Sequence, residues 1–181
     1  MVAAKADEVV AFWREAGYER WFTRDEAFDG EIRARFLATH EAAAAGALNL
    51  WEETPEGALA LLILLDQFPR NLFRGTPRAF ATDALARTIA DRALAKGLDQ
   101  EVPPDLKGFF YLPFMHSENL VDQERCVALY EAAGDEKGLP YAVEHRDIIA
   151  RFGRFPHRNP ILGRAMTEEE AAFLAGGGFS G

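Results

Sequence analysis

Apolar residues recur along most of this chain at the three- and four-residue spacing of an amphipathic helix. No segment shows the sustained alternation of apolar and polar residues that is typical of a half-buried strand. The pattern predicts helices at about 7–16, 26–45, 55–68, 77–96, 118–133 and 141–152, with a last short helix after Thr167. The sequence therefore predicts an all-α fold built from helical hairpins.

One predicted helix is apolar on every side, which is typical of a helix at the centre of a domain. Its core is the run ALALLILL at 58–65, and Thr54 followed by Pro55 is a favourable start. Asp66 lies near its C-terminal end, where the helix dipole disfavours a carboxylate. We therefore expect a cation beside Asp66, for which Arg70 is a candidate.

Capping residues mark several other helix ends. Asp25 is suited to start the second helix, and Thr76–Pro77 and Ser117 are suited to start two later ones. The run 167–170, Thr-Glu-Glu-Glu, has the form of a capping box. Gly153 is expected to end the helix 141–152, because glycine readily adopts the left-handed conformation of a helix C-terminus.

The length and cysteine content indicate one domain in a reducing environment. A chain of 181 residues can bury a continuous core without disulfides, and the segment 98–104 is too short to separate domains. We expect a single all-helical domain over 1–175 and a flexible, glycine-rich tail over 176–181. The one cysteine, Cys126, lies in an apolar helical pattern and is expected to be a small core residue.

Charge and hydropathy exclude two classes of partner. The formal net charge is −9, whereas nucleic-acid binding depends on a basic face. The longest apolar run, 58–65, is far shorter than the roughly 20 residues that span a bilayer. The first fifteen residues lack the pattern of a signal peptide. We expect a soluble, cytoplasmic protein, and the sequence leaves its oligomeric state open.

Three polar segments, 66–71, 115–119 and 154–164, each follow or precede a predicted helix. The stretch 141–164 concentrates five arginines and two histidines in an otherwise acidic chain. Because the planar guanidinium group binds carboxylate and phosphate with two hydrogen bonds, we expect a pocket for a small anionic ligand or an acidic peptide terminus. The expected ligand-binding residues are Arg70, Asn71, His116, Arg154, His157, Arg158, Asn159 and Arg164.

Two alternatives remain open. In an enzyme, His116 or His157 would act as general acid or base on an anionic substrate, with Glu118 or Asp66 orienting the imidazole. In a structural or partner-binding protein, the same polar residues would only satisfy the backbone groups at helix ends.

The sequence contains no signal for a metal or a nucleotide cofactor. Its histidines, His40, His116, His145 and His157, do not share the spacing of metal ligands on one helix, and His145 lies on an apolar face. Neither a P-loop nor a GxGxxG motif is present. We therefore expect no metal and no cofactor.

The polar segments carry a resemblance to a known family. The blocks LLDQFPRN at 64–71, LPFMHSE at 112–118 and FPHRN at 155–159, with LGR at 162–164, resemble those of the bacterial domain-of-unknown-function family number 924. The aromatic pairs at 12–13 and 21–22 are similar too. The resemblance implies an all-helical fold similar to tetratricopeptide repeats, here without a regular repeat period. It implies no activity, substrate or catalytic residue.

Overall fold

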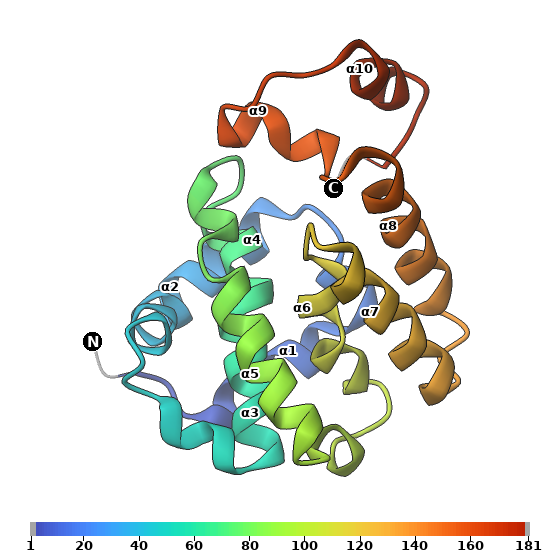
Figure 1. Ribbon diagram of the computed structural model, residues 1–181. Helices are drawn as coiled ribbons and strands as arrows, with labels where there is room; N and C mark the ends of the chain where they lie inside the picture. Colours follow the sequence, from blue (N-terminus) through green and yellow to red (C-terminus); the bar gives the residue numbers. More distant parts are fainter. Residues whose placement is uncertain (1–2, 180–181) are drawn as a thin grey trace. The chain divides into compact units, whose positions relative to one another are not determined.

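The computed structural model describes residues 3–179, and these form helices joined by short turns, with no strand among them (Figure 1). The all-α prediction is confirmed. None of the helices within 3–179 combines the length and the apolar character needed to cross a bilayer. The expected tail residues 180 and 181 lie outside the described residues.

The chain divides into two compact units, which are described separately. The first takes in the chain up to Arg74 together with Arg78–Pro113, and the second takes in Gly75–Pro77 together with the chain from Phe114 onward. The boundary falls inside α6 (Leu112–Met115). The expectation of a single folding domain over 1–175 stays a prediction.

Along the first unit the helices surround a buried central segment. The elements are α1 (Ala6–Trp21), α2 (Glu26–Ala44), η1 (Asn49–Glu53), α3 (Pro55–Leu62), η2 (Ile63–Gln67), α4 (Phe68–Leu72), η3 (Pro77–Phe80), α5 (Asp83–Ala95), η4 (Leu98–Glu101) and η5 (Lys107–Phe110), where η2 is a π-helical turn and the other η elements are 3₁₀ helices. Every residue at 57–69 is buried, and α3 packs against α1, α5 and η1. The prediction of a central buried helix is confirmed.

Aromatic side chains fill the core of this unit. The Trp13 ring stacks on Phe28 at a centroid distance of 6.0 Å and meets Phe68 edge-on at 5.6 Å. Phe36 lies 5.2 Å from Phe68 on the other side. Such pairs contribute about 0.5–1.5 kcal/mol each beyond the burial of their surface. They fix α1 and α2 against α4.

The central helix is not a continuous α-helix, in contrast to the expectation for 55–68. At η2 the backbone hydrogen bonds span five residues instead of four, and the Phe68 amide donates to the carbonyl of Ile63. Pro69 explains the change, because its ring collides with the carbonyl four residues before it in a regular α-helix. The π-helical turn relieves that collision, and helical structure continues through Pro69 into α4.

Pro69 has no backbone N–H group, so it donates no hydrogen bond to the preceding turn. Carbonyls of η2 therefore accept hydrogen bonds from other elements. His40 Nδ1 on α2 lies 2.8 Å from the Leu64 oxygen, and Thr82 Oγ1 donates to the Leu65 oxygen at 2.5 Å. Because a carbonyl only accepts, His40 carries its proton on Nδ1. Burial above all lowers the pKa of His40, so the ring stays neutral at pH 7. The π-helical turn is therefore held by side chains from α2 and from the start of α5.

The second unit is a helical hairpin followed by a chain of short elements. Its elements are α7 (Leu120–Ala133), α8 (Leu139–Phe152), η6 (Pro156–Arg158), α9 (Asn159–Leu162) and α10 (Glu168–Ala175). Helices α7 and α8 pack along each other, which confirms the predicted hairpin. Cys126 on α7 is buried as expected, and burial raises the pKa of its thiol to about 12.

Most predicted helix ends are confirmed. The Asp25 carboxylate accepts hydrogen bonds from the first amides of α2, and the Thr54 hydroxyl accepts one from Gly57. Gly153 ends α8 with a φ of 69°. The capping box at 167–170 is present, with both of its hydrogen bonds.

Two predicted starts are wrong. Asn119, not Ser117, caps α7, because its side-chain oxygen accepts from the Val121 amide while the Ser117 hydroxyl donates to Asp122. Thr76–Pro77 starts the 3₁₀ helix η3, whereas α5 begins only at Asp83. A threonine-proline pair favours the start of a helical turn but does not determine how far the turn continues.

Candidate functional site

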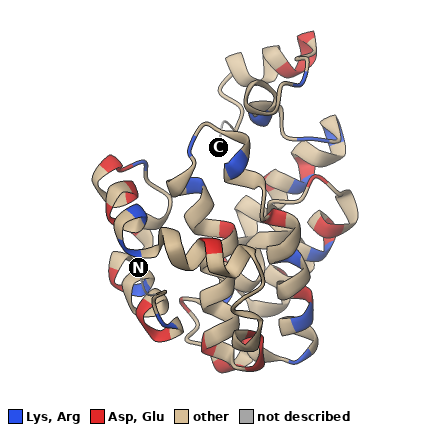
Figure 2. Cartoon of the chain, turned by 90° about the vertical axis from the view of Figure 1, so that its left-hand side faces the viewer, with Lys and Arg blue, Asp and Glu red and all other residues tan. Residues whose placement is uncertain are grey.

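The site lies in the second unit, where the chain leaves α8. Gly153 ends the helix, and Pro156 and Pro160 then restrict the backbone to two short helices, η6 and α9. We call residues 153–167 the site loop. Figure 2 shows acidic and basic residues interspersed along the helices, so the basic character of this loop is local.

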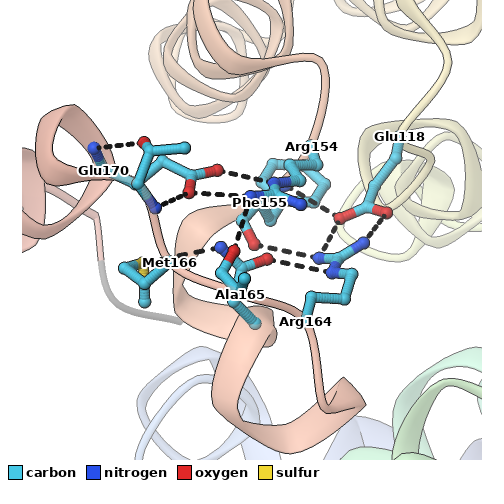
Figure 3. A network of polar contacts seen from close by, with 9 residues as sticks. Glu118, Arg154, Phe155, Arg164, Ala165, Met166 and Glu170 are labelled. Atoms are coloured by element: carbon cyan, nitrogen blue, oxygen red, sulfur yellow. Dashed lines mark hydrogen bonds and ion pairs between the residues drawn. The ribbon is translucent and has the colours of Figure 1, made fainter.

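Glu118 ties the site loop to the start of α7. Its carboxylate accepts hydrogen bonds from the Phe155 amide at 2.8 Å and from both terminal nitrogens of Arg164 at 2.7 and 2.9 Å (Figure 3). Burial acts to raise the pKa of Glu118, but the hydrogen bonds from Arg164 and Phe155 outweigh it, and the pKa lies below its ordinary value. Glu118 is therefore ionised at pH 7 and holds the loop.

Arg154 ties the site loop to α10. Its Nε and Nη2 donate to the two carboxylate oxygens of Glu170 at 2.6 and 2.8 Å, and Nη2 also donates to the Ala165 carbonyl (Figure 3). The hydrogen bonds from Arg154 and from the Thr167 amide lower the pKa of Glu170 to about 2. Glu170 thus completes the capping box of α10 and pairs with Arg154 at the same time.

Asn159 connects two parts of the site loop through hydrogen bonds. It is fully buried, its oxygen accepts from Arg164 Nε at 2.9 Å, and its amide nitrogen lies 3.4 Å from the Met166 sulfur. The backbone amide of Arg164 donates to the Asn159 carbonyl. Three of the expected ligand-binding residues, Arg154, Asn159 and Arg164, therefore hydrogen-bond within the loop network.

Three histidines and one arginine form a second polar group in this unit, which we call the His–Arg cluster: His116, His145, His157 and Arg158. Arg158 is buried, and its guanidinium carbon lies 4.5 Å from the centroid of the Phe155 ring. The His145 and His157 rings lie 5.5 and 5.7 Å from the same ring. Phe155 thus brings members of the cluster to one place.

The pKa of His145 depends on the electrostatic character of the cluster. Its Nδ1 lies 2.8 Å from the Tyr141 carbonyl, so Nδ1 carries the proton and Nε2 is the basic nitrogen. Burial lowers the pKa of His145 to about 3, and electrostatic interactions with His116, Arg158 and His157 act in the same direction. The prediction that His145 is a hydrogen-bonded core residue is confirmed. The surroundings of its ring therefore keep His145 neutral at pH 7.

The polar segment 66–71 belongs to the first unit, where it forms a network of its own. Arg70 donates to both carboxylate oxygens of Asp83 at 3.1 Å, and its Nη1 lies 3.5 Å from the Asp66 carboxylate. The predicted cation beside Asp66 is confirmed as Arg70. Asn71 donates to the Asp29 carboxylate at 2.8 Å.

The structure thus groups the expected residues by unit. His116, Glu118 and the site loop share the second unit, whereas Asp66, Arg70 and Asn71 lie in the first. Sequence reasoning missed Phe155 as the centre of the His–Arg cluster and Glu170 as the partner of Arg154. The capping box at 167–170 marked Glu170, but it carried no indication of a second role.

A metal site finds no support in the geometry. Within residues 3–179, no three His, Cys, Asp or Glu side chains are grouped so that they could hold a metal ion. The positive charge of Arg158, which acts on His145, also opposes the binding of a cation there.

Three comparisons relate the chain to known proteins. The family model "Bacterial protein of unknown function (DUF924)" matches residues 9–178. A solved structure of a protein of unknown function from Agrobacterium tumefaciens, ATU0120, is similar with 51% sequence identity and a TM-score of 0.91, covering 93% of this chain and 96% of the other. No curated protein matches the sequence.

Proposed function

The chain belongs to DUF924, a family of bacterial proteins of unknown function, and we propose that it binds a small anion through the His–Arg cluster. The anion would be a phosphate or carboxylate group, either of a small molecule or of an acidic peptide terminus. The observation that carries the proposal is the grouping of Arg158, His145 and His157 around the Phe155 ring within one unit. His116 interacts electrostatically with His145.

The carboxylates nearest to the cluster are directed elsewhere. Glu118 points its oxygens at Arg164 and the Phe155 amide, and Glu170 points its oxygens at Arg154 and the Thr167 amide. Arg154 and Arg164 therefore pair with these two acidic groups, and Glu118 also interacts electrostatically with Arg158. Arg158 and the histidines supply the hydrogen-bond donors of the proposed site.

Arg158 is suited to be the principal contact. A guanidinium group binds a carboxylate or phosphate with two parallel hydrogen bonds, and stacking on an aromatic ring restricts its motion before the ligand arrives. The Arg158 guanidinium lies over the Phe155 ring, so ordering it on binding would cost little entropy. His116 and His157 are half-buried and would supply further N–H donors.

This proposal narrows the set of residues expected from the sequence. His116, His157 and Arg158 would contact the ligand, while Arg154, Asn159 and Arg164 would position the loop that carries two of them. Arg70 and Asn71 have partners in the first unit, Asp83 and Asp29, and are not part of the proposed site.

Thermal unfolding in the presence of anions tests the proposal. Sodium phosphate and sodium acetate, each compared with sodium chloride at equal ionic strength and pH 6.5, should raise the unfolding temperature with a saturable dose dependence for at least one of them. A ligand at one hundred times its dissociation constant stabilises by about 2.7 kcal/mol. No saturable rise with either anion would refute the proposal.

Two variants locate the effect. Arg158→Gln should abolish the rise, whereas Arg151→Gln should keep it, because Arg151 is exposed and pairs with Glu169. If Arg158→Gln fails to fold, His157→Gln replaces it and should weaken the rise. An equal response in the cluster variants and in Arg151→Gln would place binding elsewhere.

A purely structural role is the second candidate, and the ion pairs of the site loop favour it. Glu118 with Arg164 and Glu170 with Arg154 fix the loop without any ligand. On this alternative, cluster variants would lower stability and no anion would change it. Acid–base catalysis gains less support, since the carboxylate expected to orient a histidine, Glu118, faces Arg164.

We also infer a cytoplasmic location and a fold similar to tetratricopeptide repeats. The single, buried Cys126 supports a reducing compartment, and the packed pair of α7 and α8 supports the repeat-like arrangement.

A further inference from the structure

Phe179 fills a slot beside the His–Arg cluster. Its ring lies 4.5 Å from the His145 ring and 5.2 Å from the His157 ring, measured between centroids. Phe155 contacts the same two histidines. Two imidazoles are therefore each in contact with both phenyl rings, and the space that Phe179 takes is shaped by flat aromatic faces and edges.

The segment that delivers Phe179 turns back after α10. Gly177 has a φ of 82°, and the Gly178 amide donates to the Phe173 carbonyl at 3.0 Å. A Cβ atom at Gly178 would lie 2.5 Å from the Phe173 ring, so any other residue there would force this ring to move. The glycine-rich stretch at 176–178 is thus shaped to return Phe179 to the hairpin, a role that its composition did not indicate.

Phe179 also borders a surface groove. This groove of about 660 Å³ runs along α8 and is lined by Tyr141, Ile148, Phe152, Phe173 and Phe179, with Glu144, Asp147 and Arg151 among its charged members. This volume is in the range of small-molecule sites. Phe179 is only half-buried, so part of its ring already faces solvent.

We infer that the slot binds the aromatic ring of the protein's ligand, and that Phe179 occupies it until the ligand displaces it. The inference rests on the proposed anion binding, since His157 belongs both to the slot and to the anion contacts. It identifies the ligand class as aromatic carboxylates, with the ring between His145 and His157 and the carboxylate at Arg158.

Calorimetric titration of the full chain with benzoate tests this inference. Phe179→Ala should bind benzoate about tenfold more tightly than the unaltered protein, which is the gain expected when an internal competitor that fills about 90% of the sites is removed. Phe179→Ala should also prefer benzoate over cyclohexanecarboxylate, because a saturated ring cannot make the tilted and edge-on aromatic contacts that Phe179 makes with His145 and His157. Phe22→Ala removes an exposed phenylalanine of the first unit and should bind benzoate like the unaltered protein.

A spectroscopic readout is independent of affinity. Benzoate should shift the imidazole proton resonances of His145 and His157 in Phe179→Ala through its ring current. Equal or weaker benzoate binding in Phe179→Ala, or no preference over cyclohexanecarboxylate, would overturn the inference. If Phe179→Ala unfolds, Phe179→Leu takes its place and should bind benzoate more tightly than the unaltered protein but by less than tenfold, because leucine still fills part of the slot.

The two proposals fail in different ways. In one outcome, phosphate or acetate stabilises the protein in an Arg158-dependent way while Phe179→Ala leaves the affinity for benzoate unchanged. That result would support the anion site and refute the aromatic slot. If no anion, benzoate included, stabilises either protein, both proposals are refuted.

Discussion

Glu118 and Arg164 lie 46 residues apart in the sequence and meet in two parallel N–H···O hydrogen bonds of 2.7 and 2.9 Å. The pair joins the residue just before α7 to the end of the site loop. Glu118 also accepts a hydrogen bond from the Phe155 amide, so one carboxylate holds the site loop near its start at Phe155 and near its end at Arg164. The loop that presents His157 and Arg158 depends on this contact.

Replacing Glu118 with glutamine should therefore destabilise the protein. The change keeps the shape of the side chain but removes its charge, and Arg164 loses a charged acceptor in a half-buried place. We expect a loss of about 1–3 kcal/mol in the free energy of unfolding, measured by urea denaturation. Glu169→Gln breaks an exposed pair with Arg151 and should cost less than about 0.5 kcal/mol. Equal losses in the two variants would contradict the assigned role.

His145 should make stability fall between neutral and mildly acid pH. Its pKa is 6.5 in the unfolded chain and about 3 in the folded protein, so the unfolded state binds more protons at pH values between the two. The free energy of unfolding should drop by up to about 2 kcal/mol between pH 7 and pH 5.

The matching variant is His145→Gln, which removes the titrating group. Its free energy of unfolding, measured in urea at pH 5, 6 and 7, should depend less steeply on pH than that of the unaltered protein. The charge of Arg158, which acts on His145, is unchanged between pH 5 and pH 7, so the difference in slope reports the loss of the His145 imidazole. An unchanged slope would show that His145 does not titrate as described.

The π-helical turn gives a prediction for the first unit. Thr82→Val removes the hydroxyl that donates to the Leu65 carbonyl and leaves a buried acceptor unsatisfied. The expected loss is about 1–3 kcal/mol by thermal or urea unfolding. Thr82→Ser keeps the hydroxyl and should lose less than Thr82→Val. A larger loss for serine than for valine would indicate that the methyl group, not the hydrogen bond, matters at this position.

Two glycine-to-alanine changes should have opposite signs. Gly30 lies on the exposed side of α2, and no neighbouring atom lies within 4 Å of the place that an added Cβ atom would take. Gly30→Ala should therefore stabilise by about 0.5–1 kcal/mol through helix propensity. At Gly57 a Cβ atom would collide with the Trp51 carbonyl, so Gly57→Ala should destabilise by about 1–3 kcal/mol. Stabilisation by both, measured as unfolding temperature, would contradict the packing around η1.

The sequence predicted the helices well wherever their patterns were local. The apolar run at 58–65, the cap at Asp25 and the stop at Gly153 each depend on residues within one or two turns, and each is confirmed. The π-helical turn was missed. Pro69 was a local signal, but it was interpreted as the end of the helix, and the side chains that satisfy the turn's carbonyls, His40 and Thr82, lie 24 and 17 residues from their acceptors.

The amino-acid sequence by itself determined the all-α fold, the buried central segment and the residue types gathered at the site. It could not determine which arginine pairs with which acid, because several guanidinium groups compete for each carboxylate and only their distances in three dimensions decide. In the tertiary structure Glu118 pairs with Arg164, and Glu170 pairs with Arg154. The tertiary structure also returns Phe179 from a glycine-rich stretch to the His145 ring, where burial and the positive charge of Arg158 keep the imidazole neutral.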